Sequence, residues 1–572
     1  MINFNTEYKA PGDGLWLLDN SHFYRPVSPY VEKLFTESVV KGLKESSSKY
    51  GLIISHLDYA YVNGFFYKKV VLCTAKDFNS ENDEVISERI NRGVEAIEKK
   101  LWREDLDIWD RIVKPSAIKQ NDKIQAIDIF TISDSKLIEH LNECYENSLY
   151  MMYLHHIYTI PSVLPLGLYL SFCQEKGGIA PSEALSLLAG TTSISLGIAE
   201  DTLRRLVSSM REDNIDAKYF INMKEEDILS EIIRISNANK NIKKELNNYF
   251  NLVGNRLITG YDITDKVGND MPDVLVDNIL SHLNEDNNET NNEFDIENEK
   301  KYNRILSKIP SEHHIEFNEL LNEARLLNRL RDERSLYTDV LATGLARRAL
   351  KHAGERLHKM GKIEDPSLAL YATNEEVCDL LAGKNTILSS TLIERRDWCT
   401  SKCIENAPVM LGKEDNVSYG QGGIENLPKA ARLSLSAISI VLKEVYEEST
   451  FVEDGSKLTG SPVSPGIYEG IARIINSVED FGKIQKGDVL VTRSTTASYN
   501  VILPLLGAIV TDRGGQLSHA AIVAREFGIP SVVGTRDATQ VIEDGCRIRV
   551  DGSNGTVETL FTILCNRHFH LH

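Results

Sequence analysis

The chain has few cysteines and no long hydrophobic run. Eight cysteines are scattered over 572 residues, which excludes the disulfide framework of small secreted proteins. With 36 glycines and 16 prolines, the composition also excludes collagen-like and wholly disordered chains. The longest apolar stretch, Ile160 to Phe172, is shorter than the roughly 20 residues that cross a bilayer, and it contains Pro161 and Pro165.

Positive charge is also scarce. Lys and Arg number 64 against 83 Asp and Glu, so the net charge is −19. An acidic chain repels phosphate backbones and anionic lipid, so we expect neither nucleic acid nor a membrane as a partner. The N-terminus lacks a basic segment followed by an apolar one, which predicts no signal peptide. A cytoplasmic location with reduced cysteines follows, in a chain long enough for about three or four domains.

The first half of the chain changes from a strand pattern to a helical one. An Asn-Gly pair at 63–64 lies between two aromatic runs and predicts a hairpin over residues 56–68. Apolar residues at helical spacing predict a helix over residues 201–210. Residues 323–362 are rich in Arg and lack proline, which suits one or two long helices.

Two polar segments interrupt the helical pattern. Residues 284–300 are nearly all Asn, Asp and Glu, so we expect a solvated loop or a disordered insert; an acidic docking segment is the alternative. A further helix is predicted over about 426–447. Residues 450–466 are rich in Gly, Ser and Pro and are interpreted as a flexible linker.

After the linker the pattern becomes one of short strands and turns. One helix is predicted over residues 518–527, ended by Gly528 and Pro530. The predicted strands cover residues 488–492, 507–511, 531–534 and 546–551. These elements make an α/β unit of roughly one hundred residues, which is an ordinary domain size.

The segment from residue 511 to residue 534 carries the clearest chemistry. Gly514 and Gly515 follow a predicted strand and allow a phosphate to approach the backbone. Ser518 is a good N-cap, and His519 then lies in the first helical turn, where the helix dipole favours an anion. A neutral imidazole there can attack a phosphoryl group and hold it covalently. The alternative is a histidine that only packs beside a helix cap.

This segment resembles the swivelling phosphohistidine domain of the phosphoenolpyruvate-utilising enzyme family, which includes pyruvate phosphate dikinase, phosphoenolpyruvate synthase and rifampin phosphotransferase. The resemblance implies that His519 becomes phosphorylated, with Gly514, Gly515 and Ser518 supporting the phosphate. One departure is Ala497, where the family pattern has Pro. Flanking residues that share the resemblance are Gly460, Ser461, Pro462, Ser464, Pro465, Gly466, Gly470, residues 487–492, Asp551, Gly552, Gly555, Thr556 and Val557.

The upstream region looks like the substrate-binding part of rifampin phosphotransferase-like proteins. The similar stretches are residues 16–29 (WLLDNSHFYRPVSP), 190–206 and 325–348. The resemblance implies a multidomain α+β protein in which a largely α-helical acceptor domain precedes a β/β/α swivelling phosphohistidine domain. The expected boundaries are 1–449 for the acceptor domain, 450–466 for the linker and 467–572 for the swivelling domain.

The phosphoryl donor site is missing from the pattern. No glycine-rich phosphate loop stands in the first half of the chain. In this respect the chain resembles the histidine-bearing subunit of phenylphosphate synthase, whose separate ATP-grasp subunit donates the β-phosphoryl of ATP. The resemblance implies an ATP-grasp subunit or domain in trans, which handles Mg²⁺ and ATP, and we assign no metal site to this chain.

The acceptor site is expected in the helical domain. Cationic side chains stabilise a phosphoryl group in transfer, although an exposed, ion-paired face explains a single Arg equally well. Asp19 and His22 could orient and deprotonate the acceptor hydroxyl, or His22 could be structural. We assign no role to the adjacent pairs His155-His156 and His313-His314. The candidate cations are Arg329, Arg331, Arg334, Arg395 and Arg396.

The resulting hypothesis is a phosphotransferase subunit. His519 would carry a phosphoryl group from an ATP-grasp partner, with conversion of ATP to AMP and phosphate, to a small phenolic or alcoholic hydroxyl compound. One alternative is a phosphocarrier whose acceptor site belongs to another protein. Another is a binding module that does not transfer phosphoryl groups, against which the intact Gly-Gly-x-x-Ser-His segment argues.

Overall fold

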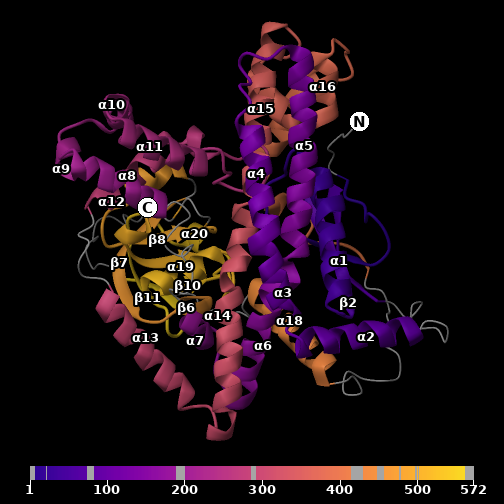
Figure 1. Cartoon of the computed structure of the whole chain (residues 1–572), viewed down its shortest axis with the longest axis vertical. Coiled ribbons are helices and arrows are strands. Elements are labelled where there is room, and N and C mark those ends of the chain that lie inside the picture. The colour runs from indigo at the N-terminus through magenta and orange to yellow at the C-terminus, as the bar shows by residue number, and fades with distance from the viewer. Residues whose placement is uncertain are drawn as a thin grey trace, which may run out of the picture. The chain divides into compact units, whose positions relative to one another are not determined.

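The computed structural model describes residues 7–20, 22–73, 83–188, 200–284, 291–413, 429–446, 457–475, 478–495, 499 and 502–560. The chain divides into two compact units, which are drawn in Figure 1 and described here separately. The helical unit comprises Met1–Lys176, Thr191–Glu293 and Ile309–Ile440. The C-terminal unit comprises Gly177–Gly190, Phe294–Lys308 and Val441–His572.

The helical unit begins with a small antiparallel sheet. Its strand order is β2-β3-β1-β4, with β2 at Ile54–Val62, β3 at Phe65–Leu72, β1 at Leu15–Leu18 and β4 at Met410–Gly412. The predicted hairpin is confirmed as β2–β3. Asn63 and Gly64 have φ angles of 51° and 88°, the left-handed backbone that a two-residue hairpin turn of this kind requires.

Long helices pack around one core in this unit. Figure 1 shows α4, α5 and α15 running side by side. The long helices predicted in 323–362 are confirmed as α14 and α15, and the one near 426–447 as α18. The helices are α1 (Val40–Lys49), α2 (Asp83–Glu98), α3 (Leu101–Ile108), α4 (Lys114–Gln125), α5 (Asp134–Ile157), α6 (Thr159–Gly177), α14 (His314–Leu336), α15 (Asp339–Lys359), α16 (Asn374–Leu381), α17 (Ser389–Ser401) and α18 (Lys429–Tyr446). Shorter helical turns are η1 (Pro29–Val31), η2 (Leu34–Val39), η3 (Trp109–Val113), η6 (Ser311–His313), η7 (Pro366–Tyr371) and η8 (Ile404–Asn406).

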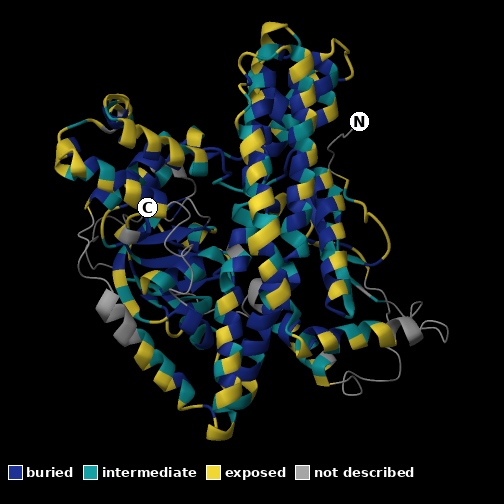
Figure 2. Cartoon of the chain, viewed as in Figure 1, coloured by how far each residue is buried: buried dark blue, intermediate teal, exposed yellow. Residues whose placement is uncertain are grey.

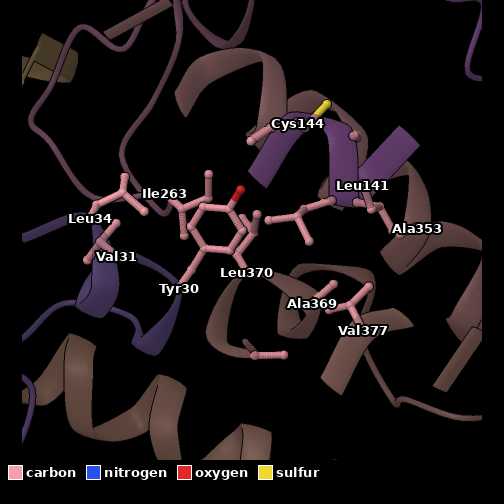
Figure 3. Close-up of a cluster of buried hydrophobic side chains, with 14 of the residues drawn as sticks. Tyr30, Val31, Leu34, Leu141, Cys144, Ile263, Ala353, Ala369, Leu370 and Val377 are labelled. Atoms are coloured by element: carbon pink, nitrogen blue, oxygen red, sulfur yellow. The ribbon is translucent and has the colours of Figure 1, made fainter. Parts of the chain in front are cut away.

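The core is built where α5 and α15 meet η1 and η7. The ring of Tyr30, on η1, lies among Leu141 of α5, Ile263 and Leu370 of η7 (Figure 3). Small residues on α15, such as Ala353, are fully buried and let neighbouring helices approach closely. Figure 2 shows the corresponding pattern along the bundle, with buried residues on the inner faces and exposed ones outside.

A second helical cluster has its own core. It contains α8, which confirms the predicted helix over 201–210, and its apolar face includes Leu206 and Met210, both fully buried. The helices are α8 (Glu200–Glu212), α9 (Ala217–Phe220), α10 (Glu225–Ala238), α11 (Lys240–Val253) and α12 (Pro272–Asn284). The short turn η5 (Gly268–Asp270) lies between α11 and α12.

The C-terminal unit is an eight-stranded sheet with helices. The strand order is β5-β12-β11-β7-β8-β9-β10-β6, and the neighbours β7–β8, β8–β9 and β9–β10 are parallel. Its elements are β5 (Lys457–Thr459), β6 (Ser461–Ser464), β7 (Ile467–Ile474), β8 (Asp488–Thr492), β9 (Leu506–Thr511), β10 (Ser531–Val533), β11 (Arg547–Asp551), β12 (Thr556–Thr559), α7 (Pro181–Leu185), α13 (Asn291–Leu306), α19 (His519–Phe527), α20 (Ala538–Val541) and the turns η4 (Ser186–Leu188), η10 (Val478–Lys483) and η12 (Leu503–Leu505).

The architecture is therefore mostly helical with a C-terminal sheet domain, as the sequence predicts. The four predicted strands correspond to β8, β9, β10 and β11. The predicted helix over 518–527 is α19, which has Ser518 as its N-cap and ends at Gly528 with a φ angle of 65°.

Two predictions about polar segments are wrong where the structure describes them. Within the predicted flexible linker 450–466, residues 457–464 form β5 and β6, because their backbone groups pair with β12 and β10. Within the acidic insert 284–300, α13 begins at Asn291. Its C-terminal turn is anchored by the fully buried Ile305 and by the ion pair of Arg304 with Glu183 at 3.5 Å. Residues 285–290 and 450–456 lie outside the described residues.

Helices α5 and α6 together are long and apolar enough to cross a membrane, judged by length and composition alone. Residues 134–177 reach a mean hydropathy of 1.2 over their most apolar window, and 72% of that window is buried inside the protein. Burial to this extent is typical of helices that lie in a hydrophobic core. The seven described cysteines are free thiols, as predicted, and Cys565 lies outside the described residues.

Candidate functional site

His519 lies where two parallel strands end at the same edge of the sheet. Thr492, the last residue of β8, pairs with Thr511, the last residue of β9. The chain therefore leaves both strands side by side, and open parallel sheets bind ligands at this edge. The segment after β8 carries Thr495, and the loop after β9 leads to His519 at the first position of α19.

The loop before α19 has a conformation that favours glycine. Gly514 has a φ angle of 113°, and a Cβ placed on it would lie 2.8 Å from both Cβ and Oγ of Ser518. Gly515 is buried, and its carbonyl accepts a hydrogen bond from the Ser518 amide at 3.0 Å. The Ser518 hydroxyl oxygen in turn accepts the amide of Ala521 at 3.4 Å, which caps the helix. These contacts set the position of the histidine that follows.

The imidazole of His519 is held by one hydrogen bond. Its Nδ1 lies 2.8 Å from Oγ1 of Thr495, and Thr495 is buried. When Nδ1–H donates to this hydroxyl, Nε2 keeps its lone pair. The sequence analysis singled out Ala497 but not Thr495, and residues 496–498 lie outside the described residues.

The same ring is neutral over most of the pH range. Burial lowers the pKa of His519 from 6.5 to about 4. A neutral imidazole has the lone pair that attack on phosphorus requires, so no proton has to leave first.

We expect this pKa to be measurable in the intact chain. Histidine NMR should show His519 titrating near pH 4, well below an exposed histidine. Because the pKa is lower in the folded than in the unfolded state, the stability that the neutral ring contributes is present above about pH 6.5 and is lost as the pH falls toward 4. A His519→Gln variant should lose less stability over that interval; equal losses would contradict the assignment.

Hydrogen bonds from three buried side chains hold this loop to neighbouring elements. Arg525 on α19 is buried, and its Nη2 donates to the carbonyl of Gln516 at 2.5 Å. The Gln516 side chain donates to the carbonyl of Pro462, in β6, at 2.7 Å. Asp512 accepts the amide of Thr539 at 2.9 Å. The loop before α19 is thereby tied to β6 and to α20, which limits its freedom to move.

Two arginines flank the same edge of the sheet. The amide of Arg513 donates to the carbonyl of Arg493 at 2.9 Å, so the two segments run together. Burial raises the pKa of Asp512, and the positive charges of Arg493 and Arg513 oppose that rise. Both cations therefore lie near the loop that precedes His519, where they favour an anion.

In the helical unit, Asp19 and His22 form a hydrogen-bonded pair. His22 Nδ1 lies 2.8 Å from Asp19 Oδ2, and the Lys68 ammonium lies 3.3 Å from Asp19 Oδ1. The Asp19 side chain is fully buried, whereas that of His22 is 31% exposed. The predicted partnership of Asp19 and His22 is thus present, and Lys68 is an addition that the sequence analysis missed.

The five candidate arginines do not form one cluster. Arg329 pairs with Asp110 and Glu333, so it holds α14 to η3. Arg395 is buried and makes two hydrogen bonds to Glu376, at 2.7 and 3.0 Å. Arg396 pairs with its neighbour Asp397, and Arg331 is half-buried. Arg334 donates to the carbonyl of His155 at 2.8 Å. The ion pairs of Arg329 and Arg395 favour a structural role for both over a role in an acceptor pocket.

Arg334 instead belongs to a histidine cluster to which the sequence analysis gave no role. The rings of His155 and His156 lie 4.5 Å apart, and His155 Nδ1 is 2.8 Å from Asp339 Oδ1. Burial is the first cause that lowers the pKa of both histidines; the charges of Arg334 and His22 act in the same direction. Arg334 and His22 are thus both close to this pair, which places two predicted acceptor-site residues in one region.

The described part of the chain brings no three metal-binding side chains together. We derive no step through a metal bound to this chain.

Comparison with known proteins finds a family match that covers His519 and the loop before it. Residues 484–555 match the family model described as "PEP-utilising enzyme, mobile domain". The phosphoenolpyruvate synthase of Aeropyrum pernix is 47% identical over 112 residues, which are 19% of this chain and 14% of that protein. The rifampicin phosphotransferase of Bacillus subtilis is 30% identical over 212 residues, 37% of this chain and 21% of that protein.

Similarity extends further in a third relative. A Bacillus subtilis protein named as an uncharacterized phosphotransferase, YvkC, is 25% identical over 558 residues, which are 95% of this chain. The chain spans 61% of that relative's length. Among solved structures, the NMR solution structure of Enzyme I (nEIt) covers 41% of this chain at 15% identity, with a TM-score of 0.14 that carries no argument about the fold. The histidine-headed helix at the carboxyl edge of parallel strands thus lies within the residues that match the mobile domain of phosphoenolpyruvate-utilising enzymes, and the chain as a whole is similar to proteins named as phosphotransferases.

Proposed function

We propose that the chain is a phosphotransferase component in which His519 carries a phosphoryl group from an ATP-grasp subunit or domain in trans to a hydroxyl acceptor. The observation that carries the proposal is the held, neutral imidazole: His519 begins α19, its Nδ1 lies 2.8 Å from Thr495 Oγ1, and its pKa is about 4. Relatives named as phosphotransferases support the same reaction class.

The proposed reaction has two half-steps. In the first, His519 Nε2 attacks the β-phosphorus of ATP while the bond from that phosphorus to the bridging oxygen of AMP breaks. Water then attacks the γ-phosphorus and releases phosphate, which leaves phosphohistidine. In the second, the acceptor oxygen forms a bond to phosphorus while the P–N bond breaks and its electron pair returns to the ring. The hydroxyl proton goes to a base, and the histidine is regenerated.

This chain's own residues would do three things in the first step. Thr495 would hold the ring so that Nε2 faces the donor. The backbone around Gly514 and the start of α19 would receive the transferred anion. Arg493 and Arg513 would add positive charge at the same edge. ATP and Mg²⁺ are proposed to be bound by the partner.

The test uses the full chain with a purified ATP-grasp protein and ATP labelled separately at the β and γ positions. We expect acid-labile, alkali-stable label on His519 from the β position only, and only when the partner is present. Label that arrives from the γ position, or from labelled phosphoenolpyruvate instead of ATP, would overturn the dikinase route. No label at all, with a partner that is active on another phosphohistidine domain, would overturn the carrier role.

A further inference from the structure

Arg525 connects the end of α19 to the loop before the helix. It lies in the last turn of α19 and is 8% exposed. Its Nη2 donates to the carbonyl of Gln516 at 2.5 Å. Its Nη1 lies 3.4 Å from the side-chain oxygen of Gln516 and 3.4 Å from the carbonyl of Val463 in β6. A buried cation therefore holds one particular peptide bond of the loop, the one between Gln516 and Leu517.

This peptide bond lies in the middle of a turn. The Ser518 amide donates to the Gly515 carbonyl at 3.0 Å, so Gln516 and Leu517 occupy the two central positions. The peptide between them is trans, so its carbonyl and its N–H point in opposite directions. Because the carbonyl points at Arg525, the Leu517 N–H points away from it. Among the described residues, this N–H donates to no other group.

The guanidinium also makes this N–H a better donor. A hydrogen bond from a cation polarises the carbonyl, and a polarised amide donates more strongly through its N–H. The same bond limits rotation of the peptide, so the N–H needs little reorganisation when negative charge arrives beside it. Leu517 is only two residues before His519, with the helix cap Ser518 between them. The N–H is thus oriented and polarised next to the residue that we propose to be phosphorylated.

We propose that Arg525 is a positioning residue for the phosphohistidine at position 519. By holding the Gln516 carbonyl, it presents the Leu517 N–H to an oxygen of the phosphoryl group. The inference rests on the proposed function. Arg525 itself does not touch the phosphoryl group, because its guanidinium lies on the carbonyl side of the same peptide.

This hydrogen bond protects the phosphoryl group from water. In hydrolysis the P–N bond breaks with its electron pair returning to the ring, a water oxygen bonds to phosphorus, and the water proton passes to the solvent. The transition state for loss of a phosphoryl group is loose, so its oxygens carry less negative charge than in phosphohistidine. A donor to these oxygens therefore stabilises the bound group more than the departing one, and it slows hydrolysis.

The alternative is that Arg525 only packs α19 against β6. Ser464 of β6 contributes to the same packing, because its buried hydroxyl donates to the carbonyl of Ala524 in α19 at 3.2 Å. Ser464→Ala removes this contact and leaves the hydrogen bond between Arg525 and Gln516 in place. It is therefore the matched control for a purely structural role.

One amide signal reports on the peptide in the full chain. Leu517 is the only leucine that directly follows a glutamine, so carbonyl-¹³C glutamine and ¹⁵N leucine together give a single correlated signal. Phosphoramidate transfers its phosphoryl group to histidine and releases ammonia, so no partner protein is needed. We expect the Leu517 proton signal to move downfield on phosphorylation in the wild-type chain and in Ser464→Ala, but not in Arg525→Met. An unmoved signal in a wild-type chain that carries acid-labile, alkali-stable phosphate on His519 would overturn the proposal.

The half-life of the phosphohistidine gives an independent readout. Arg525→Met should shorten it about tenfold, which is the scale of one hydrogen bond to a charged group. Arg525→Lys keeps a cation and should shorten it less, whereas Ser464→Ala should leave it unchanged while lowering the free energy of unfolding. Half-lives that follow the free energies of unfolding across all three variants would overturn the proposal, because packing alone would then explain them.

The same chain separates this inference from the proposed function. A Leu517 shift after chemical phosphorylation, with no label from ATP and the ATP-grasp partner, would support the positioning role and overturn only the route from ATP. Label from ATP on His519, with a half-life that is the same in Arg525→Met as in the wild-type chain, would overturn the positioning role and leave the carrier function intact.

Discussion

Replacing His519 by asparagine is expected to abolish labelling of the chain from ATP, by at least about 10³-fold, which is the scale of losing a covalent nucleophile. Asparagine keeps a polar side chain at the first position of α19 and can still hydrogen-bond to Thr495, so α19 and its Ser518 cap should persist. What disappears is the ring nitrogen that bonds to phosphorus. The measurement is acid-labile, alkali-stable label per chain after incubation with the ATP-grasp partner.

Two further variants separate the nucleophile from its surroundings. Thr495→Val removes the hydroxyl 2.8 Å from Nδ1 but keeps the imidazole, so labelling should slow by about 10- to 100-fold and not vanish. His22→Asn should leave labelling of His519 unchanged, because the predicted role of His22 is in the second half-step. If His519→Asn is labelled as fast as the wild-type chain, the phosphoryl group is not carried on His519.

Replacing Trp109 by alanine is expected to lower the free energy of unfolding of the helical unit by about 3–5 kcal/mol. Trp109 is fully buried on η3, and its ring centroid lies 5.1 Å from that of Tyr158. Its indole N–H donates to Glu333 on α14 at 2.9 Å. The substitution opens a cavity and also removes a neutral donor from a buried carboxylate.

Urea unfolding followed by far-ultraviolet circular dichroism measures this loss. Trp109→Phe, which keeps most of the ring volume but not the N–H, should lose less stability than Trp109→Ala. Ile112→Ala is the matched control in the same helical turn, because Ile112 is 60% exposed, and its effect should stay within about 0.5 kcal/mol. A Trp109→Ala chain as stable as the Ile112→Ala chain would show that η3 is not anchored through this ring.

Local sequence rules predicted the elements whose signals are short-range. The Asn63-Gly64 turn requires a left-handed backbone, and only a hairpin between the flanking aromatic runs uses it. Ser518 and Gly528 bound α19 because a hydroxyl caps the first amides and a glycine takes the left-handed φ at the end. These choices depend on a few neighbouring residues, so they can be inferred without the rest of the fold.

Where the structure differs from the expectation drawn from local composition, residues that are distant in the sequence decide the local conformation or the ion pairing. Residues 457–464 have the Gly, Ser and Pro content of a linker, yet they form strands because β12 and β10 supply partners for their backbone groups. The Arg-rich stretch suggested a cationic pocket, but the sequence did not reveal that Asp110 and Glu333 neutralise Arg329, or that Glu376 neutralises Arg395. Ion pairing depends on which helices become neighbours, and that information is not local.

The candidate histidine, its glycine loop and its helix cap can thus be predicted from one continuous segment, because strand, turn and helix follow one another there along the chain. The partners of that histidine come from elsewhere. Thr495 reaches His519 only because β8 and β9 run parallel and in register, so that Thr492 and Thr511 end together. Likewise, Lys68 joins Asp19 and His22 because strand pairing places it beside Leu17. Hydrogen bonds act over about 3 Å, and packing brings these residues within that distance although they are far apart in the sequence.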